Sequence, residues 1–424
     1  DDSAPAPPDS PAPADRDRDL PPLIDSLGID AIDQALGQLQ PAPGYAKRWR
    51  PGSAGAEAVL NTFLQDAFPS FGEARSRRDI CGTSNLSPYL RFGELSPRRV
   101  YHAVRTKVAT WEHWDVDSRH SISQSARAFL KNLCLRDYSY HAFFYNPALT
   151  TDPMLPRFAD FPWRNDHDAF ERWRMGKTGY PIVDAAMRQL RATGWLHNTL
   201  RFLVASFMTK YLLLPFELGV NEFQRLLVDA DWASNALGWQ WTAGCSEDAF
   251  PFRCLVNPVG MGKRQDPTGC YIREWLPELV ALPDAFLHCP WKAPADLLAV
   301  AGITLNQDYP SPMVDPSFAR TRAREALQRL KKRAATSRSS VPRDVTDLIE
   351  EWPQEEDDDD DHALGLNGKN ENRLDLLPAL WQLLHYDQPP GVGTNSRQPT
   401  DLPLSAAEAA SAVHSGANAA GPEQ

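Results

Sequence analysis

The residues best suited to hold a phosphate lie in the run Gly82–Ser87, which reads GTSNLS and precedes an apolar helix start. The small hydroxyl residues Thr83, Ser84 and Ser87 leave side-chain O–H groups and backbone N–H groups free to bind an anion. Such a run is, on its own, usually a turn or a helix cap. It therefore predicts a phosphate site only together with other motifs.

Other common sites are missing from the sequence. No GxGxxG follows a strand and no P-loop occurs, so a dinucleotide would not bind as in a Rossmann fold. The six cysteines form no CxxC pair and none has metal-ligand spacing with histidine, so we expect no metal site. They are typical of thiols in a reducing intracellular compartment, such as the nucleus, cytoplasm or plastid. The apolar run Leu200–Leu218 is interrupted by Thr209, Lys210 and Glu217, which favours a buried helix over a membrane span.

Apolar periodicity predicts an all-α body that positions the phosphate run and the residues discussed below. Ser96-Pro97 is typical of a helix start, and Val100, Val104 and Val108 then recur on one helical face. Strand signals are weak. Further helices are expected at 166–174, 181–193, 196–213 and 221–227.

Composition divides the chain into five parts. Residues 1–19 and 341–424 are rich in Asp, Pro and Ala and have little to bury, so both are expected to be disordered extensions. Between them we expect a connector at 20–50, a helical domain at 51–317 and a basic helix at 318–340.

Charge is distributed unevenly along the chain. The net charge is −11, but 318–340 carries eight bases and one acid, and the acidic run EEDDDDD follows at 355–361. The basic run is either a solvated helix or a phosphate-binding strip masked by the acidic run. The helical body is nearly neutral, which argues against strong electrostatic binding to duplex DNA.

The acidic tail contains an apolar island at 374–386. Leu377, Leu380, Trp381 and Leu384 would lie on one face of a helix there. An amphipathic segment inside a polar tail usually folds against something, either its own chain or a partner protein.

From about Leu20 to Pro316 the chain resembles the DNA photolyase/cryptochrome family. The clearest segments, between Trp173 and Trp275, are WRMGKTGYPIVDAAMRQLRATGWLHNTLRFLVASF, DADWASNALGWQWTAG and NPVGMGKRQDPTGCYIREWLPEL. The resemblance implies a helical domain that binds FAD without a covalent link. The α/β antenna domain that normally precedes it is not found in this sequence, so no antenna chromophore is expected on this chain.

The resemblance also implies which residues contact FAD. Arg201 and Asp229 would form an ion pair under the isoalloxazine ring, and Asp231 would accept from the ribose or from ring N–H groups. Asn235 would face flavin N5, where an amide has no proton to give at neutral pH; in this it resembles photolyases rather than typical plant cryptochromes. Phe71 stands where the family commonly has a phosphate-binding tyrosine. The implied cofactor-binding residues are Thr83, Ser84, Leu86, Ser87, Arg136, Asn198, Arg201, Asp229, Asp231 and Asn235.

The family moves an electron to photoexcited flavin along three tryptophans. Trp239 matches the first of them and Trp163 the last, but the middle position is Phe216. Phenylalanine is much harder to oxidise than tryptophan. The usual path is therefore interrupted unless a neighbouring Trp or Tyr replaces it.

The positions that hold a pyrimidine dimer in repair enzymes are altered. Asn132 takes the place of a Glu that bonds a base edge, Leu135 that of a flanking Trp, and Thr199 that of a phosphate-binding Arg. Trp241 and Arg253 keep the family's residues. This pattern resembles cryptochromes and predicts weak or absent binding of duplex DNA.

These expectations favour a blue-light photoreceptor that works by photoreduction of FAD and signals to a partner protein through its tail. The alternative is an enzyme, a light-driven deoxyribodipyrimidine photo-lyase with altered or single-stranded DNA preference. A third hypothesis is a scaffold that binds partners without flavin.

Overall fold

The structure is a computed structural model, and it describes residues 49–77, 80–110, 116–246 and 255–336. Several expectations lie outside the described residues, namely those on 1–19, most of 20–50, 341–424, the tail helix at 374–386, and Arg253.

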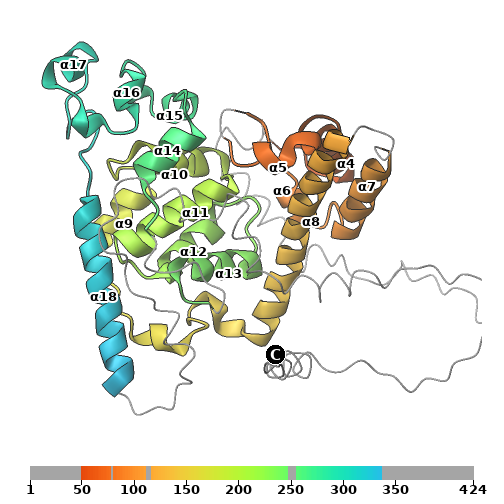
Figure 1. Cartoon of the computed structure of the whole chain (residues 1–424). Helices are drawn as coiled ribbons and strands as arrows, with labels where there is room; N and C mark the ends of the chain where they lie inside the picture. The colour runs from red at the N-terminus through yellow and green to blue at the C-terminus, as the bar shows by residue number, and fades with distance from the viewer. Residues whose placement is uncertain (1–48, 78–79, 111–115, 247–254, 337–424) are drawn as a thin grey trace, which may run out of the picture. The chain divides into compact units, whose positions relative to one another are not determined.

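The described part of the chain is mostly helical, which confirms the predicted fold class (Figure 1). They contain no strand, and Leu305 and Tyr309 form an isolated bridge. The α-helices are α4 (Ser53–Thr62), α5 (Phe71–Ala74), α6 (Ser87–Arg91), α7 (Pro97–Ala109), α8 (Val116–Tyr145), α9 (His167–Arg174), α10 (Pro181–Thr193), α11 (Asn198–Ser206), α12 (Phe216–Leu226), α13 (Trp232–Ala243), α14 (Pro258–Gln265), α15 (Cys270–Trp275), α16 (Asp284–Leu287), α17 (Ala295–Val300) and α18 (Pro316–Thr336). The π-helical turns are η1 (Phe63–Ala67) and η5 (Phe207–Tyr211), and the 3-10 turns are η2 (Phe68–Ser70), η3 (Pro147–Thr150), η4 (Pro156–Asp160), η6 (Pro277–Leu279) and η7 (Pro290–Lys292).

Local capping sets the helix ends that the sequence predicts best. Ser96 caps α7, where its hydroxyl accepts the backbone N–H of Arg99 at 3.1 Å. Helix α10 begins at Pro181, whose missing N–H costs nothing in a first turn, and stops at Gly194, which has a left-handed φ of 64°. These residues act on backbone groups close to them in the sequence, so the sequence alone places both helices.

The segment expected as one helix at 196–213 is built differently. Helix α11 runs only to Ser206, and the chain then continues through the π-helical turn η5. The helix expected at 221–227 begins earlier, at Phe216, because Pro215 stands at its N-cap in an extended conformation. Helix α12 buries Phe216, Gly219, Val220 and Phe223 along one face.

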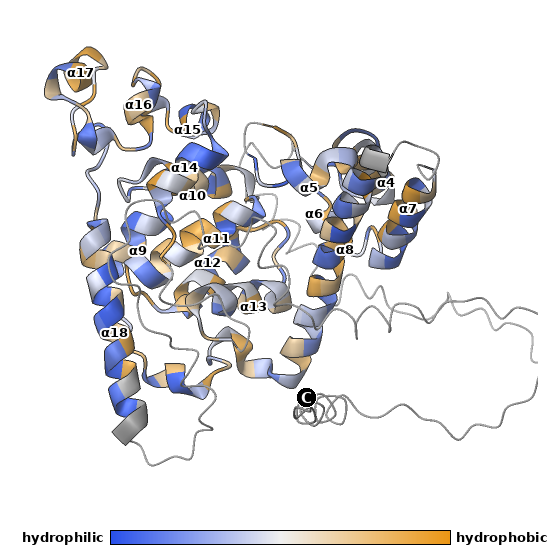
Figure 2. Cartoon of the chain, in the orientation of Figure 1, coloured by the Kyte–Doolittle hydropathy of each residue, from blue (hydrophilic) through white to orange (hydrophobic). Residues whose placement is uncertain are grey.

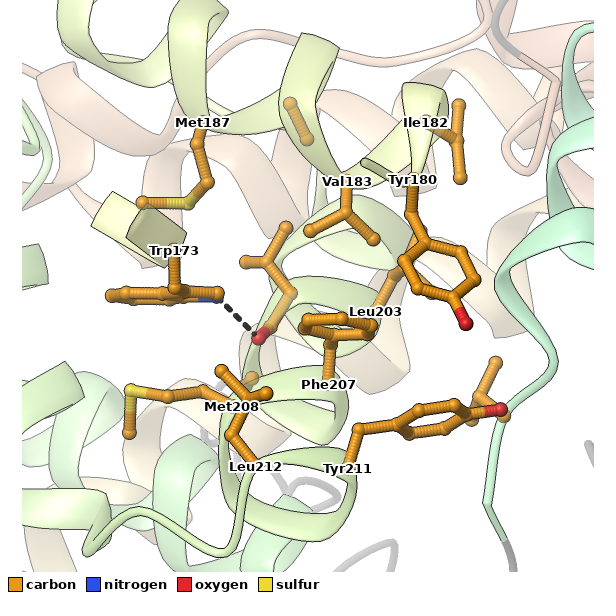
Figure 3. Packing of buried hydrophobic residues seen from close by; sticks show 14 of the residues in the cluster. Trp173, Tyr180, Ile182, Val183, Met187, Leu203, Phe207, Met208, Tyr211 and Leu212 are labelled. Atoms are coloured by element: carbon orange, nitrogen blue, oxygen red, sulfur yellow. Dashed lines mark hydrogen bonds between the residues drawn. The ribbon is translucent and has the colours of Figure 1, made fainter. Parts of the chain in front are cut away.

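Two apolar clusters are buried among the described residues. The smaller one joins α4, α7 and the first half of α8 through residues such as Leu60, Val100 and Val104. The larger one is built around α10, α11 and η5 (Figure 3), where the indole Nε1 of Trp173 donates to the Val204 carbonyl at 3.0 Å. Helix α8 packs against both α5 and α13, and so connects the two clusters.

The basic run folds as α18, which ends the described part of the chain. Ala319, Ala323 and Leu330 are buried, and the helix packs against η4 and η5. The rest of its surface is largely hydrophilic (Figure 2). The prediction of a basic helix at 318–340 therefore corresponds to a helix that is anchored by apolar residues. Arg320 and Arg329 are exposed, whereas Arg322 is half-buried and donates to the Tyr211 carbonyl.

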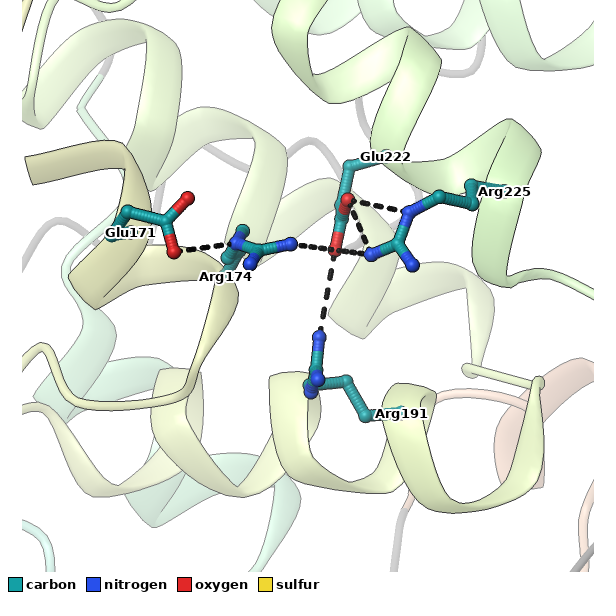
Figure 4. Close-up of polar contacts among 5 residues, drawn as sticks. All are labelled: Glu171, Arg174, Arg191, Glu222 and Arg225. Atoms are coloured by element: carbon teal, nitrogen blue, oxygen red, sulfur yellow. Dashed lines mark hydrogen bonds and ion pairs between the residues drawn. The ribbon is translucent and has the colours of Figure 1, made fainter. Parts of the chain in front are cut away.

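An ion cluster around Glu222 joins α9, α10 and α12 (Figure 4). The Glu222 carboxylate is 5% exposed and accepts two Arg225 N–H groups, with Nη2–Oε1 at 2.8 Å. Arg174 Nη1 and Arg191 Nη1 lie 3.9 and 3.8 Å from the same carboxylate. Arg174 also pairs with Glu171 at 2.8 Å. One buried carboxylate thus attracts three guanidinium groups, of which Arg174 also has Glu171 as a partner.

We expect Glu222→Gln to lower the free energy of unfolding by about 1–3 kcal/mol. Removing one partner of a fully buried pair typically costs about 3–5 kcal/mol, and the partial exposure of the arginines reduces this. Urea unfolding of the whole chain measures the change. Glu171→Gln is the control, because its more exposed pair with Arg174 is worth at most about 1 kcal/mol. Equal losses in both variants would contradict this account of the cluster.

Candidate cofactor site

The run Gly82–Ser87 forms a loop that enters α6. Asn85 has a left-handed φ of 53°, and Leu86 follows in a right-handed conformation. Successive residues of opposite hand turn their backbone N–H groups toward one side, which is an arrangement that binds anions. A side chain at Gly82 would clash with the Ala74 carbonyl, since its Cβ would lie 2.4 Å from that oxygen. The loop is therefore pressed against the end of α5.

The phosphate-run residues differ in what they can offer. Thr83 and Ser84 are half-buried and Ser87 is exposed. Ser84 Oγ accepts the Leu86 N–H at 3.4 Å. The Leu86 side chain is buried in the smaller cluster, so only its backbone is available to a phosphate. Phe71 is buried against Phe63 and Phe129, with ring centroids 5.7 and 5.4 Å away, and it makes no polar contact.

The expected ion pair between Arg201 and Asp229 is present. Arg201 Nη2 lies 2.7 Å from Asp229 Oδ2, and Arg201 Nε donates to the Leu196 carbonyl at 2.7 Å. The Asp229 side chain is 3% exposed, against 26% for Arg201. Asp229 Oδ1 is buried and accepts no hydrogen bond from the described residues. This oxygen is therefore suited to accept a donor from a bound molecule.

Asp231 has a structural role that the sequence did not indicate. It caps α13, with Oδ1 accepting the Ser234 N–H at 2.7 Å, and its Oδ2 accepts the Tyr140 hydroxyl. Burial, and then the bond to Asp231, raise the pKa of Tyr140. A carboxylate can accept about four hydrogen bonds, so a contact with a ribose would use the remaining lone pairs.

Arg136 and Tyr140 lie one turn apart on α8, which is the spacing that brings two side chains together on a helix. The Arg136 guanidinium lies 4.9 Å from the Tyr140 ring centroid and bonds Asp137 at 3.1 Å. Arg136 is therefore held beside Asp231 through Tyr140. Tyr140 was missed because its partner lies 91 residues away in the sequence.

Asn235 is fixed in one orientation on α13. Its Nδ2 donates to the Val220 carbonyl at 2.9 Å, which assigns the amide, because the opposite orientation would set two acceptors against each other. Asn198 is exposed at the start of α11. The preceding His197 caps this helix by accepting the Thr199 N–H at Nδ1, 3.1 Å away, so its proton is on Nε2.

The structure places the aromatic residues in two groups. Trp239 is 2% exposed and makes edge-to-face contacts with Trp173 and Phe223, at 6.1 and 5.0 Å. Trp163 is partly buried and contacts Phe161 at 4.4 Å. Phe216 is buried at the start of α12. Trp173 is therefore an indole in ring contact with Trp239, which sequence reasoning did not identify.

The substrate positions expected from the sequence are mostly at the surface. Asn132 and Leu135 are exposed on α8. Trp241 is exposed on α13 and contacts Phe202 at 5.5 Å. Thr199 is tied to the protein, because its hydroxyl donates to Gln265 Oε1 at 3.1 Å.

The site fits a polar, flat cofactor. Asp229 Oδ1, His197 Nε2 and Trp239 Nε1 are buried without hydrogen-bond partners among the described residues. They lie on or beside α11 and α13, which pack against each other. Buried polar groups normally have partners, so a bound ring system with both donors and acceptors would complete this region. Within the described ranges, no group of His, Cys, Asp and Glu is arranged to hold a metal ion, and no helix is long and apolar enough to cross a membrane.

Comparison with known proteins supports this interpretation. Residues 129–329 match the model of the FAD-binding domain of DNA photolyase. The chain is 41% identical to Cryptochrome-1 of Arabidopsis thaliana over 296 residues, covering 70% of this chain and 43% of that protein. It is also 41% identical to a deoxyribodipyrimidine photo-lyase of Agrobacterium fabrum, covering 69% of this chain and 59% of that protein. The chain thus spans about half the length of these relatives.

Solved structures give the same result. A bacterial class III photolyase from Agrobacterium tumefaciens superposes with a TM-score of 0.64 at 40% identity, covering 69% of this chain and 58% of that one. A cryptochrome from Synechocystis superposes with a TM-score of 0.59 at 33% identity, covering 66% and 56%. Cryptochromes and photolyases are therefore both similar to this chain.

Proposed function

Because the chain carries the FAD-binding domain of the DNA photolyase/cryptochrome family, we propose that it binds FAD without a covalent link and acts as a blue-light photoreceptor. Bound FAD supplies one-electron chemistry under blue light. In this proposal the signal reaches a partner protein through residues 341–424, and binding to duplex DNA is weak or absent. We place the protein inside the cell and expect no antenna chromophore on this chain.

Different residues of the chain would have different roles in such a photoreceptor. Arg201 and Asp229 would bind and orient the isoalloxazine ring, and the loop at Gly82–Ser87 would hold the phosphates. Asn235, fixed by the Val220 carbonyl, offers an amide without a transferable proton. Trp239 is buried and would be the residue that gives up an electron.

One observation favours the photoreceptor over the repair enzyme. The exposed residues Asn132 and Leu135 stand where a repair enzyme would have the Glu and the Trp that bind a dimer. The alternative, a light-driven photolyase with altered or single-stranded DNA preference, is supported by Trp241. Its exposed indole offers a stacking surface for a base.

We expect Phe216→Trp to increase the rate and yield of FAD photoreduction several-fold. The change would restore an oxidisable indole at the middle position. Blue-light bleaching of the flavin absorption under anaerobic conditions with a thiol reductant measures it.

Trp173→Phe tests whether an indole detour already operates. It should lower the photoreduction yield of the wild type, which has Phe216, and leave that of the Phe216→Trp variant nearly unchanged. An unchanged yield in Phe216→Trp would contradict the assignment of this position to the electron path.

A further inference from the structure

Gly219 lies in the middle of α12, where the helix faces Trp239. A Cβ at this position would lie 2.1 Å from Cη2 of Trp239 and 2.4 Å from both Cζ2 and Cζ3. Atoms do not approach so closely, so the six-membered ring of the indole rests directly on the backbone of α12. The backbone of Gly219 is helical and has no positive φ. Packing, rather than backbone conformation, therefore requires glycine here.

Two other aromatic rings also pack against the indole of Trp239. Phe223 is one turn beyond Gly219 on the same face of α12, and its ring meets Trp239 at 5.0 Å with an interplanar angle of 77°. Trp173 of α9 meets it at 6.1 Å and 76°. Trp173 is itself held by the bond from its Nε1 to the Val204 carbonyl. The indole of Trp239 therefore has little freedom to tilt or to shift along α12.

We propose that Gly219 is a positioning residue that sets the depth and plane of the Trp239 indole against bound FAD. The inference rests on the proposed function, in which Trp239 supplies the electron. Electron transfer between two rings falls steeply with their separation. A methyl group between α12 and the indole would displace the indole from its packed position. The displacement would slow that transfer, even where FAD still binds.

The chain offers a matched control in Gly238. This residue immediately precedes Trp239 on α13, and a Cβ there would meet no described atom within 4 Å. Gly219→Ala and Gly238→Ala make the same chemical change and both favour a helix. They differ in whether the new methyl group meets the indole.

The fluorescence lifetime of bound FAD, measured on the full chain, reports how well a nearby indole quenches the flavin. We expect Gly219→Ala to lengthen the lifetime several-fold and Gly238→Ala to leave it unchanged. In a Trp239→Phe background, Gly219→Ala should add no further lengthening, because the quenching indole is already gone. A wild-type lifetime in Gly219→Ala, or equal lengthening with and without Trp239, would overturn the proposal.

A second measurement does not depend on the cofactor. The edge-to-face pair of Trp239 and Trp173 contributes to the near-ultraviolet circular dichroism of the FAD-free protein. Gly219→Ala should change this signal and Gly238→Ala should not. Identical spectra for the wild type and Gly219→Ala would show that the indole has not moved and would contradict the inference.

Gly219→Ala could also prevent FAD binding altogether. Phenylalanine lacks Cη2 and the outer carbons of the indole, so the double variant Gly219→Ala/Trp239→Phe removes the clash. Recovery of FAD binding in the double variant would support the contact, and its failure would count against it. A colourless wild type would instead contradict the proposed function, whereas a coloured wild type with unaffected Gly219→Ala contradicts the positioning role alone.

Discussion

The Asp229→Ala variant should lose its FAD and much of its stability. It leaves the Arg201 guanidinium without its carboxylate partner, which costs about 3–5 kcal/mol in a fully buried pair. Because Arg201 is 26% exposed, we expect a loss near the lower end, about 3 kcal/mol. The variant also removes Oδ1, the buried acceptor that a bound ring would use. Urea unfolding and flavin absorption after desalting measure the two losses.

Asp284→Ala provides a control for the same kind of pair at the surface. Arg273 pairs with Asp284 at 2.5 Å. The Arg273 side chain is 25% exposed, nearly the same as the 26% of Arg201, but the Asp284 carboxylate is 71% exposed. An exposed pair is worth at most about 1 kcal/mol, so this variant should keep both its flavin and its fold. If Asp229→Ala bound FAD as the wild type does, the assignment of this pair to the cofactor site would be wrong.

The second large effect concerns pyrimidine dimers in duplex DNA. We expect weak binding by the wild type and an affinity about 10²–10³-fold higher in the double variant Asn132→Glu/Leu135→Trp. One base–aromatic stack is worth roughly 1–3 kcal/mol and a hydrogen bond to a charged group roughly 1.5–3 kcal/mol. Each 1.4 kcal/mol corresponds to about a tenfold change in affinity, and incomplete pre-organisation reduces the sum.

Fluorescence anisotropy at one fixed salt concentration measures this affinity, with an undamaged duplex of the same sequence as the control. The gain should be confined to the damaged duplex, because both substituted residues would contact the lesion. Tight, dimer-specific binding and efficient light-driven repair by the wild type would favour the photolyase hypothesis over the photoreceptor.

Much of the fold could be predicted because local residues determine it. Helix α10 starts at Pro181 and ends before Gly194, and Ser96 caps the start of α7. All three residues act on neighbouring backbone groups. Prediction was less exact where an irregular element occurs. The expected helix at 196–213 passes from α11 directly into the π-helical turn η5, and no periodicity in the sequence marks that change.

The residues of the site could be predicted from the family resemblance, but only partly from the chemistry of the residues themselves. The pair of Arg201 and Asp229 is 28 residues apart, and nothing in the local sequence joins the two. Tyr140 and Gly219 were missed for the same reason. Their roles arise from contacts with Asp231 and Trp239, which only the packing of α8 and α12 on α13 brings together.

The absorption spectrum of the purified full chain, taken before and after blue light, tests the central claim most directly. After incubation with FAD and desalting, we expect a bound oxidised flavin that is released on denaturation, as a non-covalent cofactor would be. Blue light should bleach it in the wild type and far more slowly in Trp239→Phe. A chain that stays colourless, or a Trp239→Phe variant that bleaches as fast as the wild type, would contradict the claim that this domain binds FAD and photoreduces it through Trp239.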